Sequence, residues 1–370
     1  MPGPLRPRRT DTAAGGAVVA VTGAGSGAGA AVLARLATAP RLARVVGVDT
    51  VVAPGLAAVG GGPELSWYEV DVVDPRITGA FAGVTAVVHL AVDLTPDIDR
   101  AGQRQRNTRA AQTVLTAAFA AGVRRVVVVS SALAYGAYPD NPVPLGDDAP
   151  LRAVPEASVV GDLLEIERIA AASRRSHRGL AVTVLRPAVV LGAGEREPMA
   201  ALLSAPRLLR IRGATTRWQF CHVADLAAAA QLAALAGPGE LDGPANVAST
   251  GWLDHDQLER VSGRRSLELP ERVAVGTAER LHRLGITPAP PSELAYLVHP
   301  WVVDCARLRA AGWTPRYGNA EAVTEHLGEL GRGGRRDGRG ATAAAGAAGA
   351  AVALVGTAAL VRRARRRRSG

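Results

Sequence analysis

The sequence predicts an α/β fold built around a doubly wound parallel sheet, followed by a smaller C-terminal substrate lobe. Apolar runs of strand length alternate with segments that carry apolar residues at helical spacing. A glycine-rich turn follows the first apolar run, and an acidic residue ends the second. Strands that alternate with helices pair in parallel through right-handed crossovers, and such sheets bind ligands at the carboxyl ends of their strands.

The first strand, turn and helix lie within residues 16–34. Gly23 permits a sharp turn, Gly27 lets the backbone approach a phosphate, and Gly29 lets the helix pack closely on the strand. The backbone N–H groups at the start of such a helix form a cradle for a pyrophosphate. Because Gly25 lies among these glycines, more than one spacing fits, and the turn alone is weak evidence.

The second strand, residues 43–48, ends in Asp49. The spacing between Gly29 and Asp49 in the sequence is about that at which a carboxylate contacts the ribose hydroxyls of a bound dinucleotide. An acid there favours NAD, because it repels the 2′-phosphate of NADP. The alternative is a surface aspartate after a glycine-rich loop, but the order of strand, turn, helix, strand and acid favours a cofactor site. We therefore expect NAD as the cofactor.

Three further strands and two helices are expected before residue 192. The strands are 65–70, 85–90 and 125–129. One helix covers about 103–121, with apolar residues at helical spacing, and another includes 155–168. These elements complete the predicted sheet.

Composition narrows the class of protein. The chain has 370 residues, of which 48% are hydrophobic, enough for one large core or two moderate ones. Only Cys221 and Cys305 occur, so we expect neither a disulfide framework nor a bound metal. The net charge of +10 is concentrated in arginines of the last forty residues, which argues against specific nucleic-acid binding by the body. The chain contains no lysine.

Short motifs along the chain carry a family resemblance. They are Thr22-Gly23 with Gly27-Ala28-Gly29, Asp49, Asp71-Val72, His89-Leu90-Ala91, Asn107, Ser130-Ser131 with Tyr135-Gly136, Leu185-Arg186-Pro187, Gly192, residues 219–227, Asn246-Val247 and residues 311–315. In this order they resemble the short-chain dehydrogenase/reductase superfamily, and most of all its extended NAD-dependent epimerase/dehydratase branch. The resemblance covers about residues 16–330. Ser26 stands where this branch usually has a glycine, so the glycine spacing is similar to the superfamily's shorter form.

The resemblance implies a Rossmann-type fold, NAD as cofactor, a small-molecule substrate such as a nucleotide sugar, and a homodimer. It implies that Ser131 is the hydroxyl that holds the substrate. The implied cofactor-binding residues are Thr22, Gly23, Ser26, Gly27, Ala28, Gly29, Asp49, Asp71, Val72, Leu90, Ala91, Asn107 and Pro187.

The catalytic Tyr-x-x-x-Lys pair of this family has no counterpart in the sequence. The Lys of that pair lowers the Tyr pKa so that a phenolate acts as the base. Aligning Glu167 with the acid that follows the Lys by four puts Val159 at the Tyr position and Leu163 at the Lys position. A tyrosine without a cation has a pKa of about 10, so at most ~0.1% is phenolate at pH 7. We expect oxidoreductase or epimerase chemistry that is lost or rerouted; the alternative is a non-catalytic dinucleotide sensor or scaffold.

Other groups have both a functional and a structural interpretation. A substitute base could come from the loop after Ser131, which carries Tyr135, Tyr138, Asp140, Asp147 and Asp148, although such groups are commonly structural or solvated. His89 is expected to pack at a strand end. His222 and Asp225 are expected to join the two lobes by hydrogen bonds. Four arginines, Arg207, Arg210, Arg212 and Arg217, form either phosphate contacts or a solvated basic face.

The expected domains are a disordered arm at 1–15, an NAD-binding domain at 16–192, and a substrate lobe at 193–330 interleaved with the last sheet elements. Residues 331–370 are a Gly/Arg linker, an apolar segment and an Arg-rich end. The segment 341–361 is uncharged for 21 residues, about the length of a bilayer span, but it is only weakly hydrophobic. We expect a cytoplasmic body attached by this segment to the inner face of the membrane. The alternative is a low-complexity tail that touches anionic lipid or RNA.

Overall fold

The computed structural model describes residues 16–25, 27–52, 62–90, 92–94, 99–192, 198–285 and 289–336. Ser26, Ala91, the expected arm at 1–15 and the expected membrane segment at 341–361 lie outside the described residues. Within the described part of the chain, no helix is both long enough and apolar enough to cross a membrane.

A seven-stranded sheet forms the centre of the fold, in the order β10-β6-β5-β4-β1-β2-β3. All its neighbouring strands are parallel. The strands are β1 Ala17–Thr22, β2 Leu42–Asp49, β3 Glu64–Glu69, β4 Ala86–His89, β5 Arg125–Val129, β6 Ala181–Pro187 and β10 Gly243–Val247. The chain runs outward from β1 to β3 and then, from β4 onward, in the opposite direction. A ligand crevice is expected where the order reverses, at the carboxyl ends of β1 and β4. The predicted doubly wound fold is confirmed.

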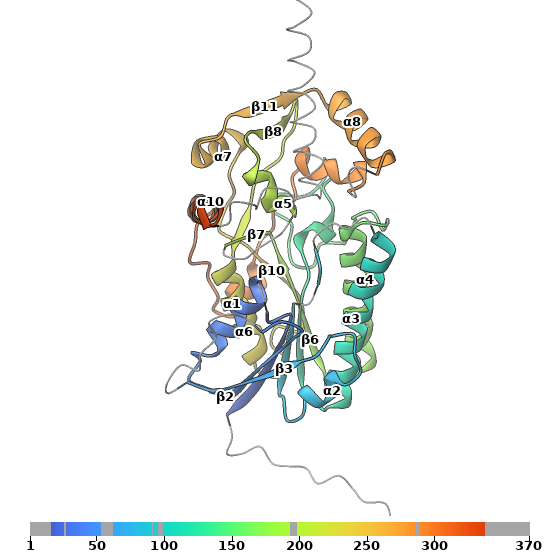
Figure 1. Cartoon of the computed structure of the whole chain (residues 1–370), viewed down its shortest axis with the longest axis vertical. Coiled ribbons are helices and arrows are strands. Elements are labelled where there is room, and N and C mark those ends of the chain that lie inside the picture. Colours follow the sequence, from blue (N-terminus) through green and yellow to red (C-terminus); the bar gives the residue numbers. More distant parts are fainter. Residues whose placement is uncertain are drawn as a thin grey trace, which may run out of the picture.

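Helices cover both faces of the sheet (Figure 1). One face carries α1 Gly27–Leu36 and α6 Val223–Leu235, and the other carries α2 Ile77–Ala80, α3 Arg100–Ala120 and α4 Val159–Ser176. Side chains alternate between the two faces: Val19 and Val21 belong to the first core, whereas Ala20 belongs to the second. Both faces are buried, so the central strands are continuous apolar runs.

Capping residues decide where the two long helices begin. Asp99 accepts a hydrogen bond from Gly102 N, so α3 begins at Arg100, a few residues earlier than expected. Ser158 accepts one from Gly161 N at 3.1 Å, so α4 begins at Val159 and residues 155–158 precede it. The expected strands differ from the observed ones by one residue or so at each end, as is usual for terminal residues.

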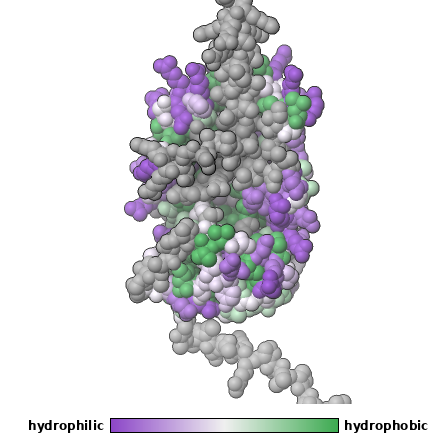
Figure 2. Space-filling model, in the orientation of Figure 1, coloured by the Kyte–Doolittle hydropathy of each residue, from purple (hydrophilic) through white to green (hydrophobic). Residues whose placement is uncertain are grey.

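The later part of the chain forms a group of elements beyond the carboxyl ends of the sheet (Figure 1). It contains a small sheet of β8 Leu208–Ile211 and β11 Ser266–Leu269, with α7 His255–Ser262, α8 Glu271–Arg283 and the 3-10 helix η3 Pro291–Leu297. A second small sheet pairs β7 Val189–Leu191 with β9 Phe220–His222. The remaining helices are α5 Pro198–Ala201, η2 Leu202–Ser204, α9 Ala306–Ala310 and α10 Asn319–Arg336. On the face seen in Figure 2, hydrophilic residues line much of the outer edge and hydrophobic ones occur in small groups.

Candidate cofactor and substrate site

The glycine turn joins β1 to α1 at the crevice. Gly23 and Gly27 have φ of +74° and +53°, a region that favours glycine. A Cβ at Gly29 would lie 1.8 Å from the carbonyl oxygen of Gly23, so the start of α1 packs directly on the turn. Ala28 is half-buried in the first turn of α1. These contacts fit a backbone cradle for a pyrophosphate.

Asp49 is held against this turn. Gly25 N donates a 2.8 Å hydrogen bond to Asp49 Oδ2, and Thr50 N donates one of 2.7 Å to Oδ1. A Cβ at Gly25 would lie 2.4 Å from the carbonyl oxygen of Val51, so the two segments require a glycine at this close approach. The carboxylate therefore lies beside the cradle, where a dinucleotide's ribose would be bound.

Thr22 and His89 join the carboxyl ends of β1 and β4. Thr22 Oγ1 and His89 Nδ1 lie 2.8 Å apart, and both side chains are fully buried. Burial lowers the pKa of His89 to about 4, so its ring is neutral near pH 7. Leu90 N then donates to the carbonyl oxygen of Thr22 at 3.0 Å. The expected packing role of His89 agrees with these contacts.

The other expected cofactor residues lie at the same edge of the sheet or support it. Asp71 is exposed and Val72 half-buried just after β3, and Pro187 is buried at the end of β6. Asn107 lies inside α3. Its side chain accepts a hydrogen bond from Asp93 N at 3.0 Å and donates to the Asp93 carbonyl at 3.1 Å. Asn107 thus fastens the loop that follows β4.

Ser131 caps the 3-10 helix η1, Ala132–Tyr135. Its Oγ accepts a hydrogen bond from Leu133 N at 3.2 Å, and the residue is only 3% exposed. A hydroxyl that accepts one hydrogen bond can still donate its own proton to a ligand. This geometry is compatible with the substrate-holding role that the resemblance implies.

Val159 and Leu163 lie one turn apart on α4 and belong to the hydrophobic core. They are 7% and 0% exposed. Polar groups occur instead on the neighbouring face of α4, where Asp162 Oδ2 accepts from Arg100 at 3.0 Å and from Asn107 at 3.2 Å. Burial raises the pKa of Asp162, and the Arg100 guanidinium opposes that shift.

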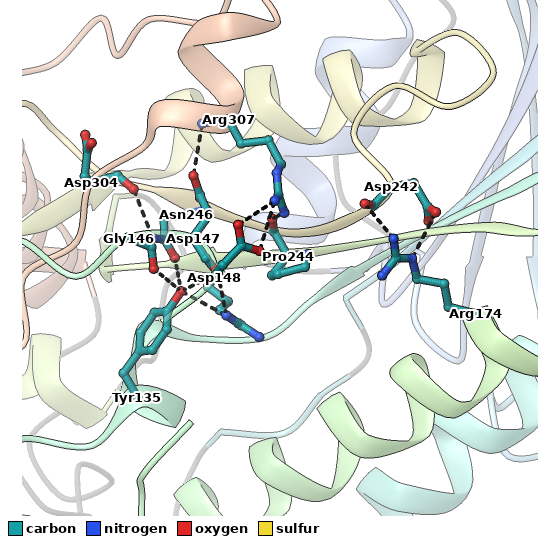
Figure 3. Close-up of polar contacts among 11 residues, drawn as sticks. Tyr135, Gly146, Asp147, Asp148, Arg174, Asp242, Pro244, Asn246, Asp304 and Arg307 are labelled. Carbon is teal, nitrogen blue, oxygen red and sulfur yellow. Dashed lines mark hydrogen bonds and ion pairs between the residues drawn. The ribbon is translucent and has the colours of Figure 1, made fainter. Parts of the chain in front are cut away.

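Tyr135 is part of a buried network and not a free base. Its hydroxyl donates to Asn246 Oδ1 at 2.8 Å and accepts from an Arg186 nitrogen at 2.9 Å. Arg186 in turn makes two hydrogen bonds of 2.8 Å to Glu167. Burial raises the pKa of Tyr135, which disfavours a phenolate. Figure 3 shows the Tyr135 hydroxyl directed at Asn246 and at the backbone around Asp147.

The acids of the same loop also have structural partners. Asp147 accepts hydrogen bonds from Asn246 N at 2.6 Å and from Arg307 N at 3.0 Å (Figure 3). Asp148 pairs with the Arg307 guanidinium at 2.9 Å, and Asp140 pairs with Arg152 at 3.1 Å. The Tyr138 hydroxyl donates to the Arg152 carbonyl at 2.7 Å. The structural interpretation of this loop therefore accounts for these groups.

His222 and Asp225 contact residues 316 and 317. Asp225 accepts hydrogen bonds from Arg316 N at 2.8 Å and Tyr317 N at 3.0 Å. His222 caps α6 and stacks on Tyr317, with ring centroids 3.7 Å apart. Among the residues that the structure describes, no cluster of three or more His, Cys, Asp or Glu side chains could hold a metal ion.

The arginines of the later lobe mostly have surface partners. Arg210 pairs with Asp256 at 2.7 Å, and Arg212 pairs with Glu268 at 2.8 Å, all with exposed side chains. The Arg217 guanidinium lies 4.7 Å from the ring centroid of Trp252. These contacts favour the solvated-face interpretation over phosphate contacts.

A cavity that sequence reasoning missed lies at the start of α4. Its volume is about 210 Å³, and its lining includes Ser158 and Glu293. Ser158 and Glu293 are 135 positions apart in the sequence. No sequence pattern pairs them; η3 reaches α4 only in the folded chain.

Comparison with known proteins agrees with this class of fold. Residues 19–247 match the NAD dependent epimerase/dehydratase family. The chain is 30% identical over 316 residues to the Mycobacterium tuberculosis protein Rv0501, covering 84% of this chain and 83% of that protein. It is 24% identical over 275 residues to the Sinorhizobium fredii protein y4nG, covering 71% and 67%.

Solved structures share the fold. The Thermotoga maritima UDP-glucose 4-epimerase with UDP-glucose has a TM-score of 0.63 and 18% identity, covering 85% of this chain and 99% of that one. The Streptomyces venezuelae dTDP-glucose 4,6-dehydratase DesIV with bound NAD has a TM-score of 0.64 and 20% identity, covering 86% and 97%.

The fold and the cradle thus define an NAD-binding protein of the Rossmann type. The chain belongs to the NAD dependent epimerase/dehydratase family, whose cofactor is NAD.

Proposed function

We propose that this chain binds NAD together with a small molecule such as a nucleotide sugar, and that its oxidoreductase or epimerase chemistry is lost or rerouted. The observation that carries this proposal is the contrast between two parts of the site. The glycine turn packed on α1 and bonded to Asp49 supports a dinucleotide site, whereas Val159 and Leu163 are apolar residues buried in the core.

The proposed cofactor contacts are those that the resemblance implies. Backbone groups of Thr22, Gly23, Ser26, Gly27, Ala28 and Gly29 would hold the pyrophosphate, and Asp49 would bind the adenosine ribose. Asp71, Val72, Leu90, Ala91, Asn107 and Pro187 would complete the site. When bound, NAD supplies a nicotinamide that accepts or donates a hydride.

The Tyr and Lys side chains that usually transfer the proton are the part of the usual site that we propose is missing here. A hydroxyl such as that of Ser131 can hold a substrate, but it needs a neighbouring base before a proton moves at neutral pH. Leu163 cannot lower the pKa of a neighbour as an ammonium does, and arginine is a poor substitute for it because it differs in shape and stays protonated. A group outside the usual pair must therefore act, or the chemistry has been lost.

Calorimetric titration of the full chain with NAD⁺, NADH and NADPH tests the binding part of the proposal. We expect micromolar binding of NAD⁺ and NADH and much weaker binding of NADPH, because Asp49 repels a 2′-phosphate. Failure of all three to bind would contradict the proposal.

A turnover experiment then distinguishes an enzyme with rerouted chemistry from a non-catalytic dinucleotide sensor or scaffold. Exchange of labelled hydrogen at a carbon of UDP-glucose, in the presence of NAD⁺, would indicate rerouted chemistry. Cofactor binding without exchange would favour the second candidate, a dinucleotide sensor or scaffold, which the apolar Val159–Leu163 face also supports.

Membrane contact through residues 341–370 and a homodimer remain predictions. Cell fractionation of the full chain and of a chain that ends at residue 340 tests the first, and sedimentation of the full chain tests the second.

A further inference from the structure

The cavity at the start of α4 has the composition of a small-molecule site. Its walls are mostly apolar, with alanines, Val154 and Val160. Its polar lining residues include Glu156, Ser158, Ser292 and Glu293. Apolar walls with a few convergent polar groups are typical of ligand sites. The volume of about 210 Å³ is below the roughly 300–1,000 Å³ of a site for a drug-sized ligand. The cavity therefore fits one group of a substrate and not a whole nucleotide sugar.

The cavity adjoins the candidate catalytic positions. Ser158, which lines it, caps α4 and directly precedes the position at which the resemblance places the tyrosine. Two further lining residues, Glu293 and Tyr296, belong to η3. Tyr296 donates a 2.6 Å hydrogen bond to the carbonyl oxygen of Leu133, whose own N–H donates to Ser131 Oγ. The turn with Glu293 is thus docked on the turn that begins at Ser131.

Charged groups from several elements surround the Glu293 carboxyl. Burial has the largest effect and raises the pKa of Glu293 to about 7. The Ser158 side chain favours the carboxylate and so opposes the rise in pKa, as does Arg100 at the start of α3, whereas Glu156 before α4 repels the carboxylate. A carboxyl that titrates near neutral pH can both hold and release a proton under working conditions.

The two tyrosines that line the cavity, Tyr138 and Tyr296, both donate their hydroxyl hydrogen to backbone carbonyls. Tyr296 donates to Leu133, as described, and burial raises its pKa further above its usual range. Tyr138 donates to the Arg152 carbonyl, and the Arg152 guanidinium lies 4.4 Å from its ring centroid. Two acidic side chains line the cavity: Glu156 accepts a hydrogen bond from Ser292, and Glu293 lines the cavity together with Ser158.

We propose that this cavity binds a hydroxyl-bearing group of the substrate and that Glu293 exchanges a proton with that hydroxyl, in place of the missing phenol. The inference rests on the proposed function. In the exchange, the ligand's O–H bond breaks as an O–H bond forms on the carboxylate, and the electron pair stays on the ligand oxygen. The reverse step returns the proton, so Glu293 ends each cycle unchanged.

Calorimetric titration of the full chain with UDP-glucose, at pH 6 and pH 8 and with and without NAD⁺, tests this role. The variants are Glu293→Gln, which keeps the size of the side chain but cannot exchange the proton, and Glu279→Gln, which changes an exposed carboxyl on α8. For the unsubstituted chain we expect tighter binding at pH 8, where the carboxylate accepts the hydroxyl's hydrogen bond. Glu293→Gln should bind about tenfold more weakly at pH 8 and lose the pH dependence, whereas Glu279→Gln should behave as the unsubstituted chain does.

Two outcomes would overturn the inference: a Glu293→Gln variant with unchanged affinity and pH profile, or an unsubstituted chain that binds no UDP-glucose in any of the four conditions. Failure of NAD⁺ to bind is measured separately and counts against the proposed function alone. If Glu293→Gln does not fold, infrared spectra of the unsubstituted chain with ¹³C-labelled glutamate provide a second test. A protonated carboxyl band that titrates near pH 7 and shifts with UDP-glucose supports the inference, and an unshifted band contradicts it.

Discussion

Asp49 is the residue whose local contacts match its expected role most directly. Its carboxylate receives backbone N–H groups from the glycine turn and from the chain that follows β2. These hydrogen bonds orient it before any ligand arrives, so little ordering remains to be done when a ribose binds. We therefore expect this side chain to act in cofactor choice.

Asp49→Ala should weaken NAD⁺ binding about tenfold to hundredfold while the chain stays folded, because a charge-assisted hydrogen bond to the ribose is lost. Discrimination against NADPH should fall as well. Calorimetric titration measures both effects, with Glu279→Ala as the control for an exposed acid. Unchanged affinity would show that Asp49 does not contact the cofactor.

Glu293 should make stability depend on pH. Its pKa in the folded chain is about 7, above the usual 4.5. A raised carboxyl pKa means that the folded state holds the proton more tightly, so this contribution is full below about pH 4.5 and is lost as pH rises to 7. The free energy of unfolding of the unsubstituted chain, relative to Glu293→Gln, should therefore fall by about 1–3 kcal/mol between pH 5 and pH 8. Urea unfolding at the two pH values checks this, and a constant difference would contradict the raised pKa.

At the scale of elements, α1 shows how a helix is placed by one missing side chain. The first turn of α1 lies against the glycine turn because Gly29 has no Cβ. The same contact between Gly29 and Gly23 sets the direction of the α1 N-terminus. The packing of α1 and its expected phosphate binding therefore depend on the same backbone arrangement.

Gly29→Ala should lower stability by about 1–3 kcal/mol and weaken NAD⁺ binding, because its Cβ would meet the Gly23 carbonyl. Gly276→Ala is a matched control: it lies within α8 with no atom within 4 Å of the added Cβ, and there Ala should be neutral or slightly stabilising. Thermal unfolding and calorimetry of both variants give the comparison. Equal behaviour of the two would show that α1 can shift without cost.

At the scale of the whole molecule, the buried polar network holds distant segments together. Glu167 of α4 pairs with Arg186 of β6, and Arg186 reaches the Tyr135 hydroxyl. Tyr135 then bonds Asn246 of β10, whose backbone N–H is bound by Asp147 (Figure 3). Each member is buried, so each depends on its partners for hydrogen bonds.

Glu167→Gln should lower the free energy of unfolding by about 3–5 kcal/mol, because it leaves the Arg186 charge buried without its partner. Glu165→Gln on the same helix breaks only the exposed pair with Arg168 and should cost less than about 1 kcal/mol. Urea unfolding of both variants measures the difference. A small change in the free energy of unfolding for Glu167→Gln would mean that water or another group binds the Arg186 guanidinium in place of the Glu167 carboxylate.

Local patterns in the sequence determined much of this protein. Strand-length apolar runs and the glycine turn predicted the parallel sheet. The second apolar run predicted a strand that ends next to Asp49. Both features depend on residues close together in the chain. The sequence also shows directly that the chain has no lysine and that no tyrosine lies near residue 159.

Only the tertiary structure decided which polar groups meet. Tyr135 could be interpreted as a base or as a structural residue until its bonds to Arg186 and Asn246 were placed. The cavity with Glu293 is lined by η3 and by the chain at the start of α4, and Tyr296 of η3 bonds the turn after Ser131. Such long-range contacts arise from burial summed over the whole fold, and burial also shifts the pKa of Glu293. No local pattern encodes either effect, so the sequence alone could predict a cofactor site but not the cavity beside Glu293.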